Sequence, residues 1–379
     1  FVVSILLITA TGIIFQQMKF LRNKPLGFQK QQMLVVPIFG TGAFSYGQKV
    51  DSSMRRRMNV FYDELSSYSK INAVTASSEM PGQGFIRGLI VPQGRSDKDN
   101  IFAPWLSVDY NFIRTMKMEV LAGRDFSKTM GKDFLNAFII NESAVRSFGW
   151  QKPENAIGKT FVRGKLSDGK KGQIIGVVRD FNFNALNNPM EPLVMDVSPS
   201  RFTEFAISIH PDHVPETIGQ VKKIWEKIFP ERVFEYSFLE NDINAQYKDK
   251  ENFSRMIEWF AGIAILLSCS GLFSLALFMA VKRAREIGIR KVLGAGIIRI
   301  LQLLSADFLK IVLLASAIAS PAAWWLMHKW LEQFAYHIQM SWIFFITGPA
   351  VAILLAFITV GYQSLLAALV NPVKTLRSE

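Results

Sequence analysis

The chain contains long apolar runs, and most of them are as long as membrane helices. The runs cover residues 1–15, about 257–281, about 308–327 and 342–360. About 20 residues are needed to cross the hydrocarbon core of a bilayer, so the last three runs each predict a transmembrane helix. The first run is shorter and starts at Phe1 without a basic leader, so we interpret it as a truncated transmembrane helix rather than a signal peptide.

A long stretch of mixed pattern separates the first two runs. Strands are predicted at residues 33–38, 71–76, 137–140, 172–178 and 205–209. Helices are predicted at about 52–68, 141–148 and 216–228, and loops at 168–172 and 182–189. This mixture predicts an α+β domain with two lobes. Residues 241–255 lack Gly and Pro, which favours a helical stalk continuing the second membrane helix, with an ordinary juxtamembrane linker as the alternative.

Basic residues orient the predicted membrane helices. The link between the second and third runs contains six of them against the single acid Glu286: Lys282, Arg283, Arg285, Arg290, Lys291 and Arg299. Lys374 and Arg377 follow the fourth run. The positive-inside rule places both segments in the cytoplasm, and therefore places the long mixed domain outside. Trp324, Trp325, Trp330 and Trp342 gather at helix ends, as an interfacial aromatic belt does.

The composition agrees with a membrane protein that has a large water-exposed part. Half of the 379 residues are hydrophobic and the net charge is +12. Because part of the basic excess adjoins apolar helices, we assign it to topology and to anionic lipid headgroups, and we expect no nucleic-acid partner. The single cysteine, Cys269, excludes an intrachain disulfide and a cysteine-based zinc site.

No catalytic, cofactor or metal site is predicted. Gly158-Lys159-Thr160 resembles the end of a phosphate-binding loop, but Pro153 stands where that loop requires Gly, so we expect no ATP binding there. His210 and His213 lack a third ligand nearby in sequence and are expected in an exposed turn. No serine stands in a Gly-x-Ser-x-Gly motif. A membrane-bound enzyme with its site in the outer domain is therefore the least favoured hypothesis.

The basic link carries the most informative pattern. On a helix, Arg283, Glu286 and Arg290 form one ion-paired stripe, and Gly294 is suited to end that helix. Ile287, Ile289, Val292 and Leu293 are interleaved with these charges. The pattern suits a short helix that docks into a groove on a cytosolic partner, and it equally suits a basic loop that only sets topology.

Several short motifs in family order resemble the MacB/FtsX-like ABC transporter permeases. Residues 285–290 (REIGIR) with 293–295 (LGA) look like the family's coupling segment. Further stretches are similar to family patterns: 112–127 to L-x-G-R-x-F, 139–142 to V-I-N-E (here with Ile139), 156–159 to P-I-G-K (with Ala for Pro), 175–186 to V-G-V-V-x-D-F (with Ile175) and 371–377 to P-x-x-x-L-R. Each motif is weak alone, but together they span nearly the whole chain.

The resemblance implies a layout for the chain. It comprises a truncated transmembrane helix 1 (1–15), an extracytoplasmic MacB-like α+β domain with stalk (16–252), transmembrane helix 2 (253–281), a cytoplasmic coupling segment (282–299), transmembrane helix 3 (300–327), a short extracytoplasmic loop (328–341), transmembrane helix 4 (342–366) and a cytoplasmic tail (367–379). The implied location is a bacterial inner membrane, with the large domain in the periplasm.

The resemblance also implies a function. Family members do not hydrolyse ATP; a cytoplasmic ABC ATPase docks on the coupling segment and drives movement of the outer domain. The residues implied in that contact are Arg283, Arg285, Glu286, Ile287, Gly288, Ile289, Arg290, Leu293, Gly294 and Ala295. Other implied partners are a second permease unit, either a copy or a fused sister half, and a periplasmic adaptor or hydrolase. The favoured function is export of periplasmic substrates; the alternatives are activation of a cell-wall hydrolase and release of lipoproteins.

Overall fold

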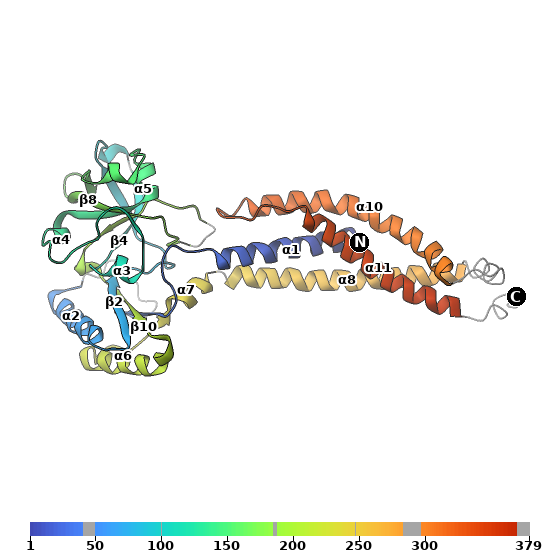
Figure 1. The fold of residues 1–379 in the computed structure, drawn as a ribbon, viewed down its shortest axis with the longest axis horizontal. Coiled ribbons are helices and arrows are strands. Elements are labelled where there is room, and N and C mark those ends of the chain that lie inside the picture. The colour runs from blue at the N-terminus through green and yellow to red at the C-terminus, as the bar shows by residue number, and fades with distance from the viewer. Residues whose placement is uncertain (41–49, 100, 185–187, 247, 283–296, 370–379) are drawn as a thin grey trace. The chain divides into compact units, whose positions relative to one another are not determined.

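The computed structural model divides the chain into two compact units. It describes residues 1–40, 50–99, 101–184, 188–246, 248–282 and 297–369. One unit, here the helical unit, combines residues 1–24 and 249–379, and the other, the sheet unit, comprises residues 25–248. Figure 1 traces the chain through both units.

Within the described residues, the helical unit contains four long helices. They are α1 (Val2–Asn23), α8 (Lys248–Lys282), α10 (Ile297–Leu331) and α11 (Ile343–Leu369). Within the described residues, three segments are long and apolar enough to cross a membrane, namely Val2–Asn23, Arg255–Leu275 and Leu309–Leu331. Ile343–Thr359 is a shorter apolar helix. The apolar run predicted over residues 1–15 therefore belongs to a helix that continues to Asn23.

Polar side chains and a close glycine contact hold α1 among its neighbours. Ser4 Oγ donates to the carbonyl of Ala264 on α8 at 3.1 Å. Gln17 is fully buried, donates to the carbonyl of Tyr336 and accepts from the amide of Ile338, each at 2.9 Å. A Cβ at Gly348 of α11 would lie 2.3 Å from Thr9 Oγ1. Small residues that permit close backbone approach and polar side chains that bond across helices are typical of packed membrane helices.

The sheet unit contains a four-stranded antiparallel sheet in the order β11-β1-β10-β2. This sheet and the helices that pack on it are here called lobe A. Its strands are β1 (Met33–Pro37), β2 (Ile71–Ser77), β10 (Glu204–Ile209) and β11 (Ser237–Phe238). The helices α2 (Ser52–Ser66) and α6 (Val214–Ile228) lie side by side on it (Figure 1). Phe61, Phe205, Trp225 and Phe229 form the aromatic centre of this core, with ring centroids 4.6–5.8 Å apart along the contacts. Asp51 begins α2 by accepting the amide of Met54 at 2.7 Å.

A second sheet of seven strands forms lobe B, in the order β5-β8-β6-β9-β4-β3-β7. Its strands are β3 (Arg87–Pro92), β4 (Phe102–Ser107), β5 (Val120–Gly123), β6 (Ala137–Asn141), β7 (Thr160–Arg163), β8 (Lys170–Val178) and β9 (Val194–Asp196). Because β7 also pairs with β8, these strands close on themselves around a buried core that includes Phe138 and Phe161.

Short helices connect the strands of the sheet unit. They are α3 (Phe112–Thr115), α4 (Asp133–Asn136), α5 (Glu142–Ser147), α7 (Leu239–Ala245) and the 3₁₀ turns η1 (Asp97–Asp99), η2 (Pro153–Ala156), η3 (Pro199–Arg201) and η4 (Pro211–His213). Two sheets with helices on them make this unit α+β with two lobes, as predicted.

The structure confirms the five predicted strands and three predicted helices, with ends that shift by one to two residues in most cases. One loop prediction is partly wrong, because β8 begins at Lys170, inside the loop predicted over residues 168–172. The start of β8 pairs with β7 while its side chains alternate between exposed and half-buried, so its polar composition hides the strand. The stretch 241–255 is helical in α7 and again in α8, and Tyr247 lies outside the described residues. Its role as a rigid stalk stays a prediction.

Candidate functional site

The predicted ATPase-coupling residues lie outside the described residues. All ten fall within positions 283–296, between the end of α8 at Lys282 and the start of α10 at Ile297. Their contact with an ATPase stays a prediction from the sequence.

The Gly158-Lys159-Thr160 segment is a turn of lobe B. Gly158 has a φ of +79°, and its amide donates to the carbonyl of Ile174 at 2.8 Å. Thr160 then begins strand β7. A phosphate-binding loop of the Walker type would lead into a helix at this point, whereas this segment leads into a strand.

His210 and His213 also lie where the sequence predicts, in an exposed turn. His210 precedes η4 and His213 is its last residue; their ring centroids are 6.1 Å apart, and each side chain is about half exposed. His210 Nδ1 lies 3.4 Å from Asp212, and His213 Nδ1 lies 3.6 Å from Glu216. Within the described residues, no three His, Cys, Asp or Glu side chains are grouped so as to hold a metal ion.

The motifs at residues 139–142 and 175–186 meet in lobe B. Asp180 accepts the amide of Ser143 at 2.9 Å and its hydroxyl at 2.8 Å, and Arg146 pairs with the same carboxylate. Glu142 accepts the amide of Asp180 at 3.1 Å. Asn141, fully buried, accepts from Ala144 and Leu193. These residues cap α5 and fix it to the neighbouring strands, so the motifs maintain the fold.

The L-x-G-R-x-F motif has a similar structural role. Gly123 has a φ of +75°, and a Cβ there would lie 2.1 Å from the carbonyl oxygen of Ile175. The next residue, Arg124, forms a two-pronged ion pair with Asp133 at 2.6 and 2.7 Å. Phe126 is buried in the core. Only glycine fits the first position, and the Arg–Asp pair anchors the following loop to α4.

A buried ion cluster crosses the inside of lobe B. Asp196 on β9 is 1% exposed and pairs with Arg163 of β7 and, at 2.8 Å, with Lys170 of β8. Ser107 Oγ donates to the same carboxylate at 3.1 Å. The Arg163 guanidinium lies 4.9 Å from the Trp105 ring centroid. Burial lowers the pKa of Lys170, while the Asp196 charge opposes that change. One acid thus neutralises two partly buried cations from different strands.

Three acids gather around the start of β10. Burial raises the pKa of Glu204 to about 8, and the nearby charges of Glu79 and Asp242 act in the same direction. Burial also raises the pKa of Glu79 to about 7. Glu204 Oε2 is buried without a hydrogen-bond partner among the described residues. Since Asp242 belongs to α7, this cluster adjoins the last helix of the sheet unit.

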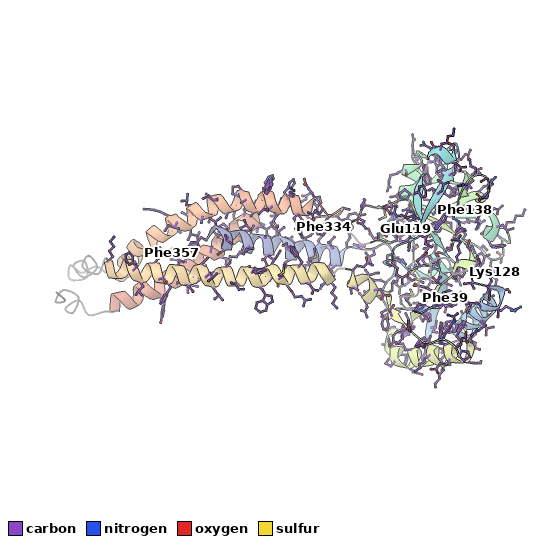
Figure 2. All side chains as sticks on the ribbon, turned by 180° about the vertical axis from the view of Figure 1, so that it is seen from behind. Phe39, Glu119, Lys128, Phe138, Phe334 and Phe357 are labelled. Carbon is purple, nitrogen blue, oxygen red and sulfur yellow. The ribbon has the colours of Figure 1, made fainter. Side chains whose placement is uncertain are left out.

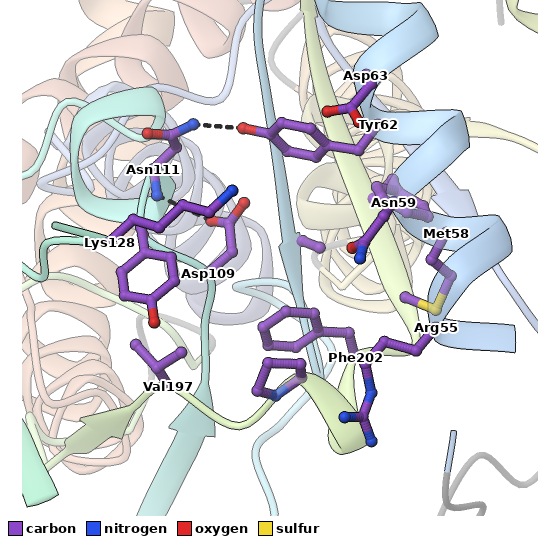
Figure 3. Close-up of a pocket in the computed structure, with 14 residues that line it drawn as sticks. Arg55, Met58, Asn59, Tyr62, Asp63, Asp109, Asn111, Lys128, Val197 and Phe202 are labelled. Atoms are coloured by element: carbon purple, nitrogen blue, oxygen red, sulfur yellow. Dashed lines mark hydrogen bonds between the residues drawn. The ribbon is translucent and has the colours of Figure 1, made fainter. Parts of the chain in front are cut away.

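The sheet unit contains an open pocket with a volume of about 380 Å³. One wall is formed by α2, through Arg55, Met58, Asn59, Tyr62 and Asp63 (Figure 3). The remaining lining comes from β2, from the segments after β4, β5 and β9, and from β10: Ala76, Asp109, Tyr110, Asn111, Lys128, Val197, Pro199, Phe202 and Phe205. The pocket thus joins α2 of lobe A to connections that lead out of lobe B. We call it the interlobe pocket.

Hydrogen bonds link the two sides of the interlobe pocket. Asn111 Nδ2 donates to the Tyr62 hydroxyl, as the dashed line in Figure 3 marks. Thr75 on β2 donates to Asp109, whose same oxygen accepts the amide of Asn111 at 3.1 Å. Burial raises the pKa of Asp109 to about 7. No motif in the sequence marks these residues, because α2 and Asp109 are about 50 positions apart.

Figure 2 contrasts the side-chain environments of the two units. Phe138 in lobe B is fully buried, whereas Phe357 on α11 is 47% exposed. Many other large apolar side chains of α8, α10 and α11 are at least half exposed, among them Trp259, Leu266, Leu314 and Leu354. Helices that expose such apolar surface require a lipid or protein environment.

Three comparisons relate this chain to known proteins. Residues 259–372 match the family model described as FtsX-like permease C-terminal. A comparison with curated proteins gave no match. Among solved structures, the periplasmic region of MacB from Actinobacillus actinomycetemcomitans is similar at 16% identity and a TM-score of 0.40, over 58% of this chain and 94% of that one. The extracellular domain of the noncanonic ABC-type transporter YknZ from Gram-positive bacteria is similar at 12% identity and a TM-score of 0.35, over 52% and 92%.

Proposed function

We propose that this chain, which carries an FtsX-like permease domain and is an ABC transporter permease subunit, transmits ATP-driven motion from a cytoplasmic ATPase to its sheet unit. The single observation that carries the proposal is the family match over residues 259–372, which includes the basic segment between α8 and α10. In the proposal that segment docks on the ATPase, and the sheet unit works on the outer side for export of periplasmic substrates.

The charge pattern supports this orientation. Six basic residues against one acid lie between two long apolar helices, which is the pattern of a cytoplasmic loop. The sheet unit then faces the opposite side of the membrane. We propose a bacterial inner membrane and a periplasmic sheet unit, and four membrane crossings by α1, α8, α10 and α11.

The length of α8 supports a route for the motion. It has 35 residues, which at about 1.5 Å per residue exceeds the roughly 30 Å of a hydrocarbon core. Its first eight residues (248–255) are mainly polar, and its apolar part begins after them. In the proposal α8 therefore continues outward beyond the lipid, so that a shift at its cytoplasmic end is carried along a stiff helix toward α7 and the sheet unit.

The proposal is tested by co-purification of the cognate ABC ATPase with this chain. Wild-type chain is expected to retain the ATPase, and Ile289→Asp is expected to reduce the retained amount at least about tenfold, because a carboxylate would be buried in an apolar contact. Val233→Asp is the matched control, because Val233 is a 79% exposed aliphatic residue of the sheet unit. Equal retention by all three proteins would contradict the role of Ile289, and no retention by wild type would contradict the partner.

A further inference from the structure

The helix α7 is short and depends on its contacts with the rest of the sheet unit. It has seven residues, and isolated helices shorter than about 12–15 residues are marginal in water. Leu239 is fully buried and Ile243 is 5% exposed, and both belong to one core with Met80 and Ala206. In the sequence α8 follows α7, so the docking of α7 decides how firmly the sheet unit holds the chain that leads into α8.

Polar contacts attach α7 to the segment after β2 and to β11. The side-chain amide of Gln246, just after the helix, donates to the carbonyl of Gly82. Gly82 has a φ of +102°, and a Cβ there would lie 2.6 Å from Gln246 Nε2, so the two segments approach closely. Within the helix, Asp242 accepts the hydroxyl of Ser237 on β11 at 2.5 Å. These contacts and the two buried apolar side chains hold α7 in place.

Glu204 lies at the start of β10, on the face of the strand that packs toward α7. Side chains alternate between the two faces of a strand, so Glu204 shares a face with Ala206, which packs in the same core as Leu239 and Ile243. Glu204 Oε2 is buried without a hydrogen-bond partner among the described residues. Such an oxygen is costly when it carries charge, and a proton on the carboxyl removes that cost.

The charges that act on Glu204 oppose its ionisation. Burial is the largest effect and raises the pKa of Glu204 to about 8. The negative charges of Glu79, after β2, and Asp242, on α7, act in the same direction, while a hydrogen bond with the Gln83 side chain opposes them. Burial also raises the pKa of Glu79 to about 7, although the positive charge of Arg201 counteracts it. Three acids from three different elements therefore meet where α7 docks.

We propose that α7 is a proton-sensitive latch, which stays docked while Glu204 and Glu79 carry protons and loosens when both ionise beside Asp242. Undocking exposes these carboxyls to water, where they ionise without the cost of burial. The docked state therefore holds its protons more tightly than the undocked state. Docking is most stable below pH 4.5 and weakens as pH rises through about 7 and 8. The latch makes the hold on the chain entering α8 depend on acidity around the sheet unit, and it does not depend on ATPase coupling.

Hydrogen exchange of the α7 amides tests the proposal on the full chain in phosphatidylcholine nanodiscs, without any ATPase. The amides of residues 243–246 report undocking, because so short a helix keeps its hydrogen bonds only while it is docked. After correction for intrinsic exchange, their protection is expected to fall at least about tenfold from pH 5.5 to pH 8.5, since one coupled proton gives up to about tenfold per pH unit. Glu204→Gln is expected to remove most of this decrease.

Glu240→Gln is the matched control on the same helix. The Glu240 side chain is 41% exposed and lies 3.5 Å from Lys30, so its carboxylate contacts water while α7 is docked. This variant is expected to keep the wild-type pH profile. Because a latch opens by itself, the α7 amides are also expected to exchange faster than those of β10 at pH 8.5.

Four results would each overturn the proposal of a latch. They are α7 protection in wild type that does not change with pH, a Glu204→Gln profile that follows wild type, an equal loss of pH dependence in Glu240→Gln, and α7 amides that exchange only together with those of β10. None of these results bears on retention of the ATPase, which the experiment leaves out.

Discussion

Asp196→Asn is expected to destabilise lobe B by about 3–5 kcal/mol, the usual cost of leaving a buried charge without its partner. Asp196 is 1% exposed and neutralises both Arg163 and Lys170. An asparagine of the same shape keeps one acceptor oxygen but removes the negative charge. Two cations from β7 and β8 would then lie inside the sheet against no acid.

Hydrogen exchange on the full chain in nanodiscs measures this effect. The most protected amides of β7, β8 and β9 report the free energy of opening lobe B, and exchange in the variant should be faster by about two to four orders of magnitude. Lys222→Gln is the control, because Lys222 and its partner Glu226 on α6 are each 57% exposed and such pairs contribute about 0–1 kcal/mol. Unchanged protection of β9 in Asp196→Asn would show that the cluster does not stabilise lobe B.

Glu204→Gln is expected to stabilise the sheet unit at pH 8 and to make its stability less dependent on pH. The folded pKa of Glu204 is raised from 4.5 to about 8, so the folded state keeps a proton that the unfolded state releases. Stability is then highest below pH 4.5 and falls as pH rises toward 8, by about 1.4 kcal/mol per pH unit. Glu79, with a pKa raised to about 7, acts in the same direction.

Protection of the β1 and β10 amides at pH 5.5 and pH 8, corrected for intrinsic exchange, provides the measurement. The amide protection of Glu204→Gln should exceed that of wild type by a larger margin at pH 8 than at pH 5.5, because glutamine removes the penalty of a buried charge. Glu226→Gln, on an exposed face of α6, should follow the wild-type pH profile. A Glu204→Gln profile parallel to that of wild type would contradict the pKa assignment.

Local pattern predicted β1, β6 and β10, which are buried along nearly their whole length, and missed β3 and β4. All five residues of β1 are buried, and its continuous apolar run identifies it. By contrast, β4 contains Pro104, and β3 contains Gly88, both of which argue against a strand when read locally. The two pair because Trp105 packs against Gly88, where a Cβ would lie 2.5 Å from the indole ring.

The basic segment after α8 and the interlobe pocket also differ in how far the sequence predicts them. The basic segment after α8 is continuous in sequence, so the sequence alone reveals its charge pattern. Its coupling role remains a prediction. The interlobe pocket draws Arg55, Asp109, Lys128 and Phe202 from separate segments, and no local pattern brings them together. The sequence alone also reveals the family motifs. In the structure, Gly123, Asn141 and Asp180 of these motifs make contacts that stabilise the fold.

We propose that ATP used in the cytoplasm moves the sheet unit relative to the helical unit. Spin labels at Lys98→Cys and Gln333→Cys, in a Cys269→Ser background that removes the single native cysteine, report the distance between the units. With the cognate ATPase in nanodiscs, we predict that trapping the ATP-bound state shifts this distance distribution, and that Ile289→Asp abolishes the shift. An identical distribution with and without ATP, in a complex that hydrolyses ATP, would contradict the account.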